Sequence, residues 1–130
     1  MKFSVLLSVY KNEKPEYLNR ALVSIWDDQT LKPDQIVLVE DGQLTSELDK
    51  VIDEWQQRLS DIFTVVNLPE NVGLGAALNE GLKYCKHDLV ARMDTDDVSL
   101  PDRFEKQIAF MNNNPQIAVS SAFIEEVNSF

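Results

Sequence analysis

The stretch Phe3-Ser4-Val5-Leu6-Leu7-Ser8-Val9 is a β-rich, largely apolar run near the start of the chain. After Pro15, apolar residues recur at helical spacing, namely Leu18, Ala21, Leu22, Ile25 and Trp26. This change of period predicts a buried strand followed by an amphipathic helix. The first run is also too short to span a bilayer, which needs about 20 apolar residues in a helix.

The alternation of strand and helix continues along the chain. Apolar, β-rich runs predict further strands at 35–39, 62–66, 88–93 and 117–124. Helices are predicted after a Thr45/Ser46 cap, over about 73–84, and from Pro101 in a first helical turn. Near-continuous apolar strands separated by helices are typical of a mostly parallel sheet with helices on both faces.

The predicted fold class is therefore a doubly wound α/β domain. Right-handed crossovers, with the chain reversing direction across the sheet after the third strand, predict the strand order 3-2-1-4. A chain of 130 residues suffices for one compact core, so we expect a single domain over 1–130.

Composition limits the possible partners. The chain carries 12 Lys and Arg against 22 Asp and Glu, a net charge of −10. This charge argues against nucleic acid as a partner, because a phosphate backbone is bound by a basic surface. A ligand with phosphate groups would need local positive charge, most simply from a bound metal ion. The single cysteine, Cys85, excludes an intrachain disulfide and a multi-cysteine zinc site.

The segment Val90-Ala91-Arg92-Met93-Asp94-Thr95-Asp96-Asp97 places three carboxylates within four residues at the end of a predicted strand. Clustered carboxylates repel one another unless a cation or hydrogen-bond donors stabilise their charged forms. Mg²⁺ and Mn²⁺ prefer such oxygen ligands. The cluster alone is equally compatible with a metal site and with a solvated acidic turn before a helix.

Other polar residues follow the predicted strands at the same edge of the sheet. Ser8 and Tyr10 lie at the end of the first strand, Glu40 and Asp41 end the second, and 94–97 follow the fourth. Ligands of doubly wound sheets bind at the carboxyl ends of the strands, near the reversal point. The position favours a binding site, although an Asp-Gly pair is also a common turn and a lone tyrosine often packs.

The segment Asn71-Val72-Gly73-Leu74-Gly75-Ala76-Ala77-Leu78-Asn79-Glu80-Gly81 contains three of the glycines. Gly73 and Gly75 precede helix-forming residues and could expose backbone N–H groups to a phosphate. The string lacks the dinucleotide fingerprint and the P-loop lysine, so it is a weak signal alone. The alternative is that the glycines allow close approach to the sheet and that Gly81 allows tight helix packing.

Taken in order, these segments closely resemble the family 2 glycosyltransferases of GT-A fold, which are inverting enzymes that use nucleotide-activated sugars. The resemblance is strongest to bacterial members that build surface polysaccharides such as lipopolysaccharide and capsule. It rests on segments 4–12, 24–30, 36–42, 71–81, 94–97 and 100–104, which together span nearly the whole chain.

The resemblance implies a role for each candidate residue. Nucleotide-binding roles fall to Ser8, Tyr10, Glu40, Asp41, Gly73 and Asp94, with Ser8, Tyr10 and Asp41 around the base and Asp94 near the ribose. Asp94 and Asp96 form the DxD signature and would bind Mn²⁺ or Mg²⁺. Asp97, Asn71 and Asn79 would support the site. Many family members carry an arginine at the position of Leu78. A direct contact from this position to the phosphate or sugar is therefore not expected here.

The resemblance also implies the partners and the extent of the enzyme. The donor would be a nucleotide-diphosphate sugar, most simply a UDP-sugar, and the acceptor a saccharide or a lipid-linked sugar. The enzyme would act in the cytoplasm, at the inner face of the membrane through peripheral association. No catalytic base is expected within 1–130, and Glu125-Glu126 is interpreted as charge at a strand end. The chain is expected to be the donor-binding part, with acceptor-binding and general-base segments elsewhere.

Two alternatives stay open at this point. A receiver-like metal-binding signalling domain shares the doubly wound fold, but it needs an acidic pair after the first strand and an aspartate ending the third. Here those strands end in Ser8-Val9-Tyr10 and Val66-Asn67. A nucleotide-binding module without catalytic activity would show the same motifs.

Overall fold

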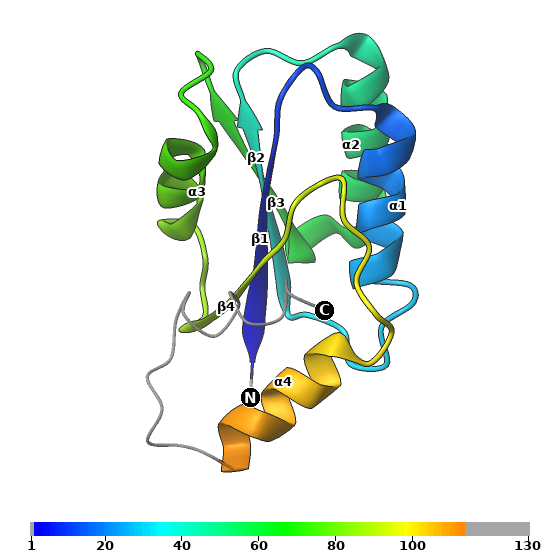
Figure 1. Cartoon of the computed structure of the whole chain (residues 1–130). Helices are drawn as coiled ribbons and strands as arrows, with labels where there is room; N and C mark the ends of the chain where they lie inside the picture. The colour runs from blue at the N-terminus through cyan, green and yellow to red at the C-terminus, as the bar shows by residue number, and fades with distance from the viewer. Residues whose placement is uncertain (1, 114–130) are drawn as a thin grey trace.

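The structure of the chain is a computed structural model, and it describes residues 2–113 (Figure 1). The strands are β1 (Phe3–Val9), β2 (Gln35–Asp41), β3 (Phe63–Leu68) and β4 (Leu89–Arg92). The helices are α1 (Pro15–Ile25), α2 (Ser46–Leu59), the short 3₁₀ turn η1 (Ser60–Ile62), α3 (Leu74–Leu82) and α4 (Arg103–Asn113). The strand predicted at 117–124 and the pair Glu125-Glu126 lie outside the described residues.

The described strands form one sheet in the order β3-β2-β1-β4, which confirms the predicted order. β1 pairs in parallel with β2 on one side and with β4 on the other, and β2 pairs in parallel with β3. The chain therefore reverses its direction across the sheet between β3 and β4. Because these strands are all parallel, their carboxyl ends lie at the same edge, and the reversal point falls between β1 and β4.

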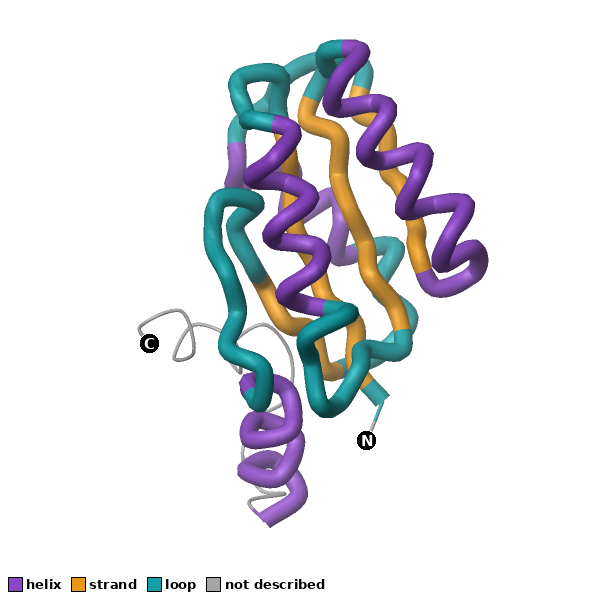
Figure 2. The backbone as a smooth tube through the Cα atoms, turned by 90° about the vertical axis from the view of Figure 1, so that its right-hand side faces the viewer, coloured by secondary structure: helices purple, strands orange, loops and turns teal. Residues whose placement is uncertain are grey.

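Helices cover both faces of the sheet. In Figure 2, α1 and α2 lie in front of the strands, and Figure 1 shows α3 on the opposite side. Alternating residues of β1 serve the two layers, because successive side chains of a strand point to opposite faces. Val5 and Leu7 pack with the α1 and α2 residues, whereas Leu6 packs with Ala77 and Leu78 of α3. The doubly wound fold class is thus confirmed.

The helix ends follow local chemistry. Thr45 caps α2, since its Oγ1 accepts a hydrogen bond from the backbone N–H of Leu48 at 3.3 Å. The α4 helix begins at Arg103, not at Pro101 as predicted. The reason is a turn over Pro101 and Asp102, closed by the N–H of Arg103 donating to the Leu100 carbonyl at 3.1 Å.

No helix within the described residues is both long and apolar enough to cross a membrane.

Gly81 fixes how closely α3 approaches the sheet. A Cβ atom added at Gly81 would lie 2.5 Å from Leu6 Cδ1 and 2.6 Å from Val39 Cγ2. Leu6 and Val39 are fully buried, so neither side chain has open space into which it can move. The predicted role of Gly81 in tight packing is confirmed.

We expect Gly81→Ala to lower the free energy of unfolding by about 1–3 kcal/mol, because the methyl group overpacks the layer between α3 and the sheet. Gly75→Ala is the matched control on the same helix, since a Cβ there meets nothing within 4 Å. The control should leave stability unchanged or raise it by up to about 1 kcal/mol. Urea denaturation followed by circular dichroism measures both, and equal stability of the two variants would contradict the packing argument.

Candidate functional site

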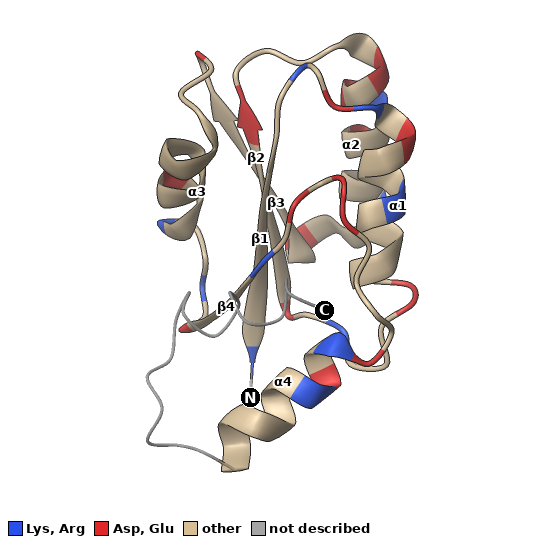
Figure 3. Cartoon of the chain, viewed as in Figure 1, with Lys and Arg blue, Asp and Glu red and all other residues tan. Residues whose placement is uncertain are grey.

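The candidate residues lie along the carboxyl edge of the sheet. Ser8 is partly buried near the end of β1, and Tyr10 follows it with 46% of its surface exposed. Glu40 and Asp41 end β2, where Glu40 pairs with Val9 in the sheet register. Figure 3 shows acidic residues both at the tip of β2 and along the loop that follows β4.

The loop after β4 gathers three carboxylates. One oxygen from each of Asp94, Asp96 and Asp97 lies within 4.8 Å of the others, and all three residues are exposed. A turn closed by the N–H of Asp97 donating to the Asp94 carbonyl, at 3.1 Å, brings the ends of the cluster together. Three convergent carboxylate oxygens open to solvent fit a hard divalent cation such as Mg²⁺ or Mn²⁺.

Thr95, between the two aspartates of the signature, is buried. It is only 6% exposed, and its Oγ1 donates to Glu13 Oε2 at 2.5 Å. Thr95 lies within the turn that joins Asp94 to Asp97, and it is buried whereas Asp94 and Asp96 on either side of it are exposed. The residue between the two aspartates of the signature therefore has a structural task of its own.

The far end of the acidic loop is anchored to the end of α1. The amide nitrogen of buried Gln29 donates to the carbonyls of Ser24 at 2.9 Å and of Leu100 at 2.7 Å. The amide oxygen of Gln29 accepts from the Phe104 N–H at 3.3 Å. The Ser24 hydroxyl accepts from the Ser99 N–H at 3.0 Å. Segments 24–30 and 100–104, on which the family resemblance partly rested, thus bind each other.

The buried, positively charged side chain of Arg103 lies beneath the same loop. Arg103 donates to the Ser99 hydroxyl at 2.8 Å and to the Arg92 carbonyl at 2.9 Å, which links α4, the loop and β4. Burial lowers the pKa of Arg103 to about 10, while the charge of Asp97 acts in the opposite direction. The guanidinium remains charged at neutral pH, and it offsets part of the negative charge of the cluster.

Asp41 holds the loop that leads into α3. Its carboxylate is buried and accepts from the N–H groups of Val72 at 2.7 Å and Gly73 at 3.1 Å. The Asn71 side chain donates to the Asp41 carbonyl at 3.3 Å. Gly42 lies directly beneath with φ of +87°, where an added Cβ would lie 2.9 Å from the Asn71 nitrogen. Asp41 and Gly73, predicted separately as nucleotide-binding, are therefore joined to each other.

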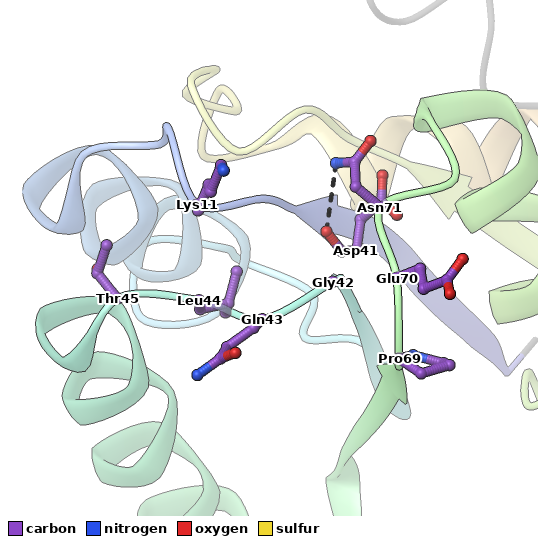
Figure 4. Close-up of a pocket in the computed structure, with 9 residues that line it drawn as sticks. All are labelled: Lys11, Asp41, Gly42, Gln43, Leu44, Thr45, Pro69, Glu70 and Asn71. Atoms are coloured by element: carbon purple, nitrogen blue, oxygen red, sulfur yellow. Dashed lines mark hydrogen bonds between the residues drawn. The ribbon is translucent and has the colours of Figure 1, made fainter.

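A cavity of about 390 Å³ opens beside Asp41 (Figure 4). It is formed by the loops after β1, β2 and β3, and it is lined by Lys11, Asp41, Gly42, Gln43, Leu44, Thr45, Pro69, Glu70 and Asn71. Lys11 brings a cationic group to this otherwise acidic edge. The sequence prediction did not include Lys11, although it belongs to the first segment of the family resemblance.

The remaining candidates differ in their surroundings. Burial raises the pKa of Glu40, and the charges of Asp49 and Asp53 raise it further. Asn79 is exposed on α3. Leu78, at the position where many family members carry arginine, is 8% exposed and packs with Leu6 and Val37 in the core. This position therefore contributes packing.

Sequence reasoning missed the residues that hold the site together. Glu13, Ser24, Gln29 and Arg103 each contact the loop after β4 through their side chains. These four residues lie within or beside the segments that carry the family resemblance. Polar residues in such segments with no assigned role could have been predicted to bind the neighbouring loops.

The comparisons with known proteins agree with this geometry. The model of glycosyl transferase family 2 matches residues 4–130. The chain therefore belongs to this family, which confirms the resemblance inferred from the sequence.

Two relatives illustrate the likeness. The chain is 49% identical over 124 residues to the amylovoran biosynthesis glycosyltransferase AmsE of Erwinia amylovora, covering 95% of this chain and 46% of that protein. It is 44% identical over 125 residues to the UDP-Gal:alpha-D-GlcNAc-diphosphoundecaprenol beta-1,3-galactosyltransferase of Escherichia coli, covering 96% and 44%. The chain thus spans slightly less than half the length of these relatives.

Solved structures show the same fold. Residues 1–349 of S. aureus TarS, in complex with UDP, match with a TM-score of 0.74 and 26% identity. The match covers 87% of this chain and 32% of that chain. The GT-A assignment of the fold is thereby confirmed.

We expect Gln29→Met to lower the free energy of unfolding by about 2–4 kcal/mol, since it leaves the Ser24 and Leu100 carbonyls and the Phe104 N–H without their buried partner. Gln56→Met, on the exposed face of α2, is the control and should change stability by less than about 0.5 kcal/mol. Urea denaturation compares the two, and a Gln29 variant as stable as the control would contradict the proposed anchoring.

Proposed function

We propose that this chain is the donor-binding part of an inverting glycosyltransferase, with a UDP-sugar as the donor. The observation that carries the proposal is the convergence of Asp94, Asp96 and Asp97 at the carboxyl edge of a family 2 sheet. The UDP assignment is supported by the name of the galactosyltransferase relative and by the UDP complex of TarS. The base would lie near Ser8, Tyr10 and Asp41, with the exposed ring of Tyr10 free to stack on it.

The acidic loop would hold the diphosphate end of the donor. Asp94 and Asp96 would bind Mn²⁺ or Mg²⁺, with Asp97 and the loop anchors in support. The bound cation would supply the positive charge that stabilises a departing nucleoside diphosphate. The strongly acidic chain favours the use of such a cation, because a diphosphate without it would meet a repulsive field.

The acceptor side belongs to the part of the enzyme beyond this donor half. We place the general base and the acceptor-binding segment outside residues 1–130, an assignment supported by relatives about twice as long. The acceptor would be a saccharide, most simply one carried on a lipid diphosphate as in the name of the E. coli relative. Such a substrate would place the enzyme at the inner face of the cytoplasmic membrane, in peripheral contact with it.

The receiver-like alternative is set aside, because the chain belongs to a glycosyltransferase family. A nucleotide-binding module without catalysis would share the same donor site, so the binding experiment below tests the feature common to both readings.

We expect Asp96→Asn to weaken UDP binding in the presence of Mn²⁺ at least about tenfold, the low end of the loss seen when even outer partners of a metal are removed. Isothermal titration calorimetry of UDP, with and without Mn²⁺, measures the effect. Without Mn²⁺, the variant should bind UDP as the unchanged chain does.

Asp88→Asn is the matched control, since Asp88 is an exposed aspartate just before the amino end of β4. It removes the same charge at the opposite end of the same strand. The proposed site would be refuted if the unchanged chain failed to bind UDP with Mn²⁺, or if Asp96→Asn and Asp88→Asn bound it equally well.

A further inference from the structure

Glu13 connects the loop after β1 to the loop after β4. Its backbone N–H donates to the Tyr10 carbonyl at 3.0 Å, which closes a turn after β1. Its carboxylate accepts from the N–H of Lys14 at 3.0 Å and from the hydroxyl of Thr95 at 2.5 Å. One residue thus contacts both the loop that carries Tyr10 and the loop that carries the acidic cluster.

The acidic loop leaves the sheet just before the cluster. The β4 strand ends at Arg92, and the N–H of Met93 makes one further hydrogen bond with the Leu6 carbonyl at 3.0 Å. The anchors formed by Gln29, Ser24 and Arg103 contact Ser99 and Leu100 after the cluster, and Arg103 also contacts the Arg92 carbonyl before it. Between these supports, the bond to Glu13 holds the residue that separates Asp94 from Asp96.

The chemistry of this bond suits a positioning task. A hydroxyl donating to an ionised carboxylate makes a short, charge-assisted hydrogen bond, which is stronger than one between neutral groups. Thr95 is nearly fully buried, so water competes poorly for its hydroxyl. Fixing Thr95 fixes the backbone of both flanking aspartates, and hence the positions of two candidate metal ligands.

We propose that Glu13 is a positioning residue that couples the nucleotide-binding loop to the metal-binding loop through Thr95. A nucleotide that orders the turn after Tyr10 would then also help to fix the positions of Asp94 and Asp96. Conversely, a cation bound by these aspartates would stabilise the turn after Tyr10. Such coupling is reciprocal by thermodynamic necessity. The inference rests on the proposed function, and it adds a residue that no assigned motif contains.

The test measures how much Mn²⁺ tightens UDP binding, as the ratio of the two dissociation constants from calorimetry without and with Mn²⁺. Thr95→Val removes the hydroxyl at constant shape, and Glu13→Ala removes the acceptor. We expect each to reduce the ratio about fivefold or more, the lower end of typical coupling between sites. UDP binding without Mn²⁺ should change less than about twofold, and the double variant should be no worse than either single variant.

Two controls separate positioning from general stability. Thr95→Ser keeps the hydroxyl and should retain the ratio of the unchanged chain. Glu16→Ala removes the same charge from the exposed start of α1 and should also retain it. Thermal unfolding of all variants reports any loss of stability, and electron paramagnetic resonance of Mn²⁺ with UDP present reports cation binding directly.

The outcomes are distinguishable. A chain that binds UDP equally with and without Mn²⁺ would refute the proposed function and this inference together. A clear Mn²⁺ effect that Thr95→Val and Glu13→Ala both preserve would refute the inference alone, even if both variants unfold at lower temperature. Equal losses in Thr95→Ser and Thr95→Val would also refute it, because the hydroxyl would then not be the cause.

Discussion

The parallel pairing of β1 with β2 on one side and β4 on the other is the constraint on which the rest of the structure depends. It makes β1 the strand from which the chain winds outward in both directions. The carboxyl ends of β1, β2 and β4 therefore share one edge, and the loops that leave them lie near each other. Every candidate residue except Asn71, Gly73 and Asn79 comes from one of these three strand ends.

The loops at this edge are held by side chains from distant segments. Asp41 binds the loop before α3, Gln29 binds the end of the acidic loop, and Glu13 binds its centre. Each uses polar groups that are buried or partly buried, where a missing partner is destabilising. These bonds give the site a defined shape before any ligand is present, which reduces the ordering that binding requires.

Electrostatics at the site combine repulsion with local relief. Three exposed carboxylates lie together on a chain with a net charge of −10. The buried guanidinium of Arg103 beneath the loop offsets part of the charge of the cluster, and Lys11 places an ammonium group beside Asp41 at the cavity. The carboxylate oxygens of the cluster remain exposed to solvent. A divalent cation from solution can therefore reach the most negative part of the site.

Periodicity and strand-end chemistry were sufficient to predict the strand order, the two helical layers and the position of the acidic cluster. These features depend on residues close in sequence, such as the alternation along Phe3–Val9 and the capping by Thr45. The start of α4 was predicted two residues too early, because the turn over Pro101 and Asp102 is closed by a bond that the sequence does not reveal. The packing roles of Leu78 and Gly81 could be assigned only once the structure showed which strand residues they contact.

By itself, the sequence determined the fold class, the family motifs and the types of ligand atom at the sheet edge, because patterning and local chemistry act over short separations. Only the tertiary structure decided which polar groups meet: Asp41 with Gly73, Gln29 with Leu100, and Glu13 with Thr95. These partners are 32, 71 and 82 residues apart, and nothing in local spacing relates them. Asp41 meets Gly73 because β2 pairs with β3. The other two pairs follow from the reversal of the chain between β3 and β4, which places β4 beside β1 in a sheet whose two faces are both buried.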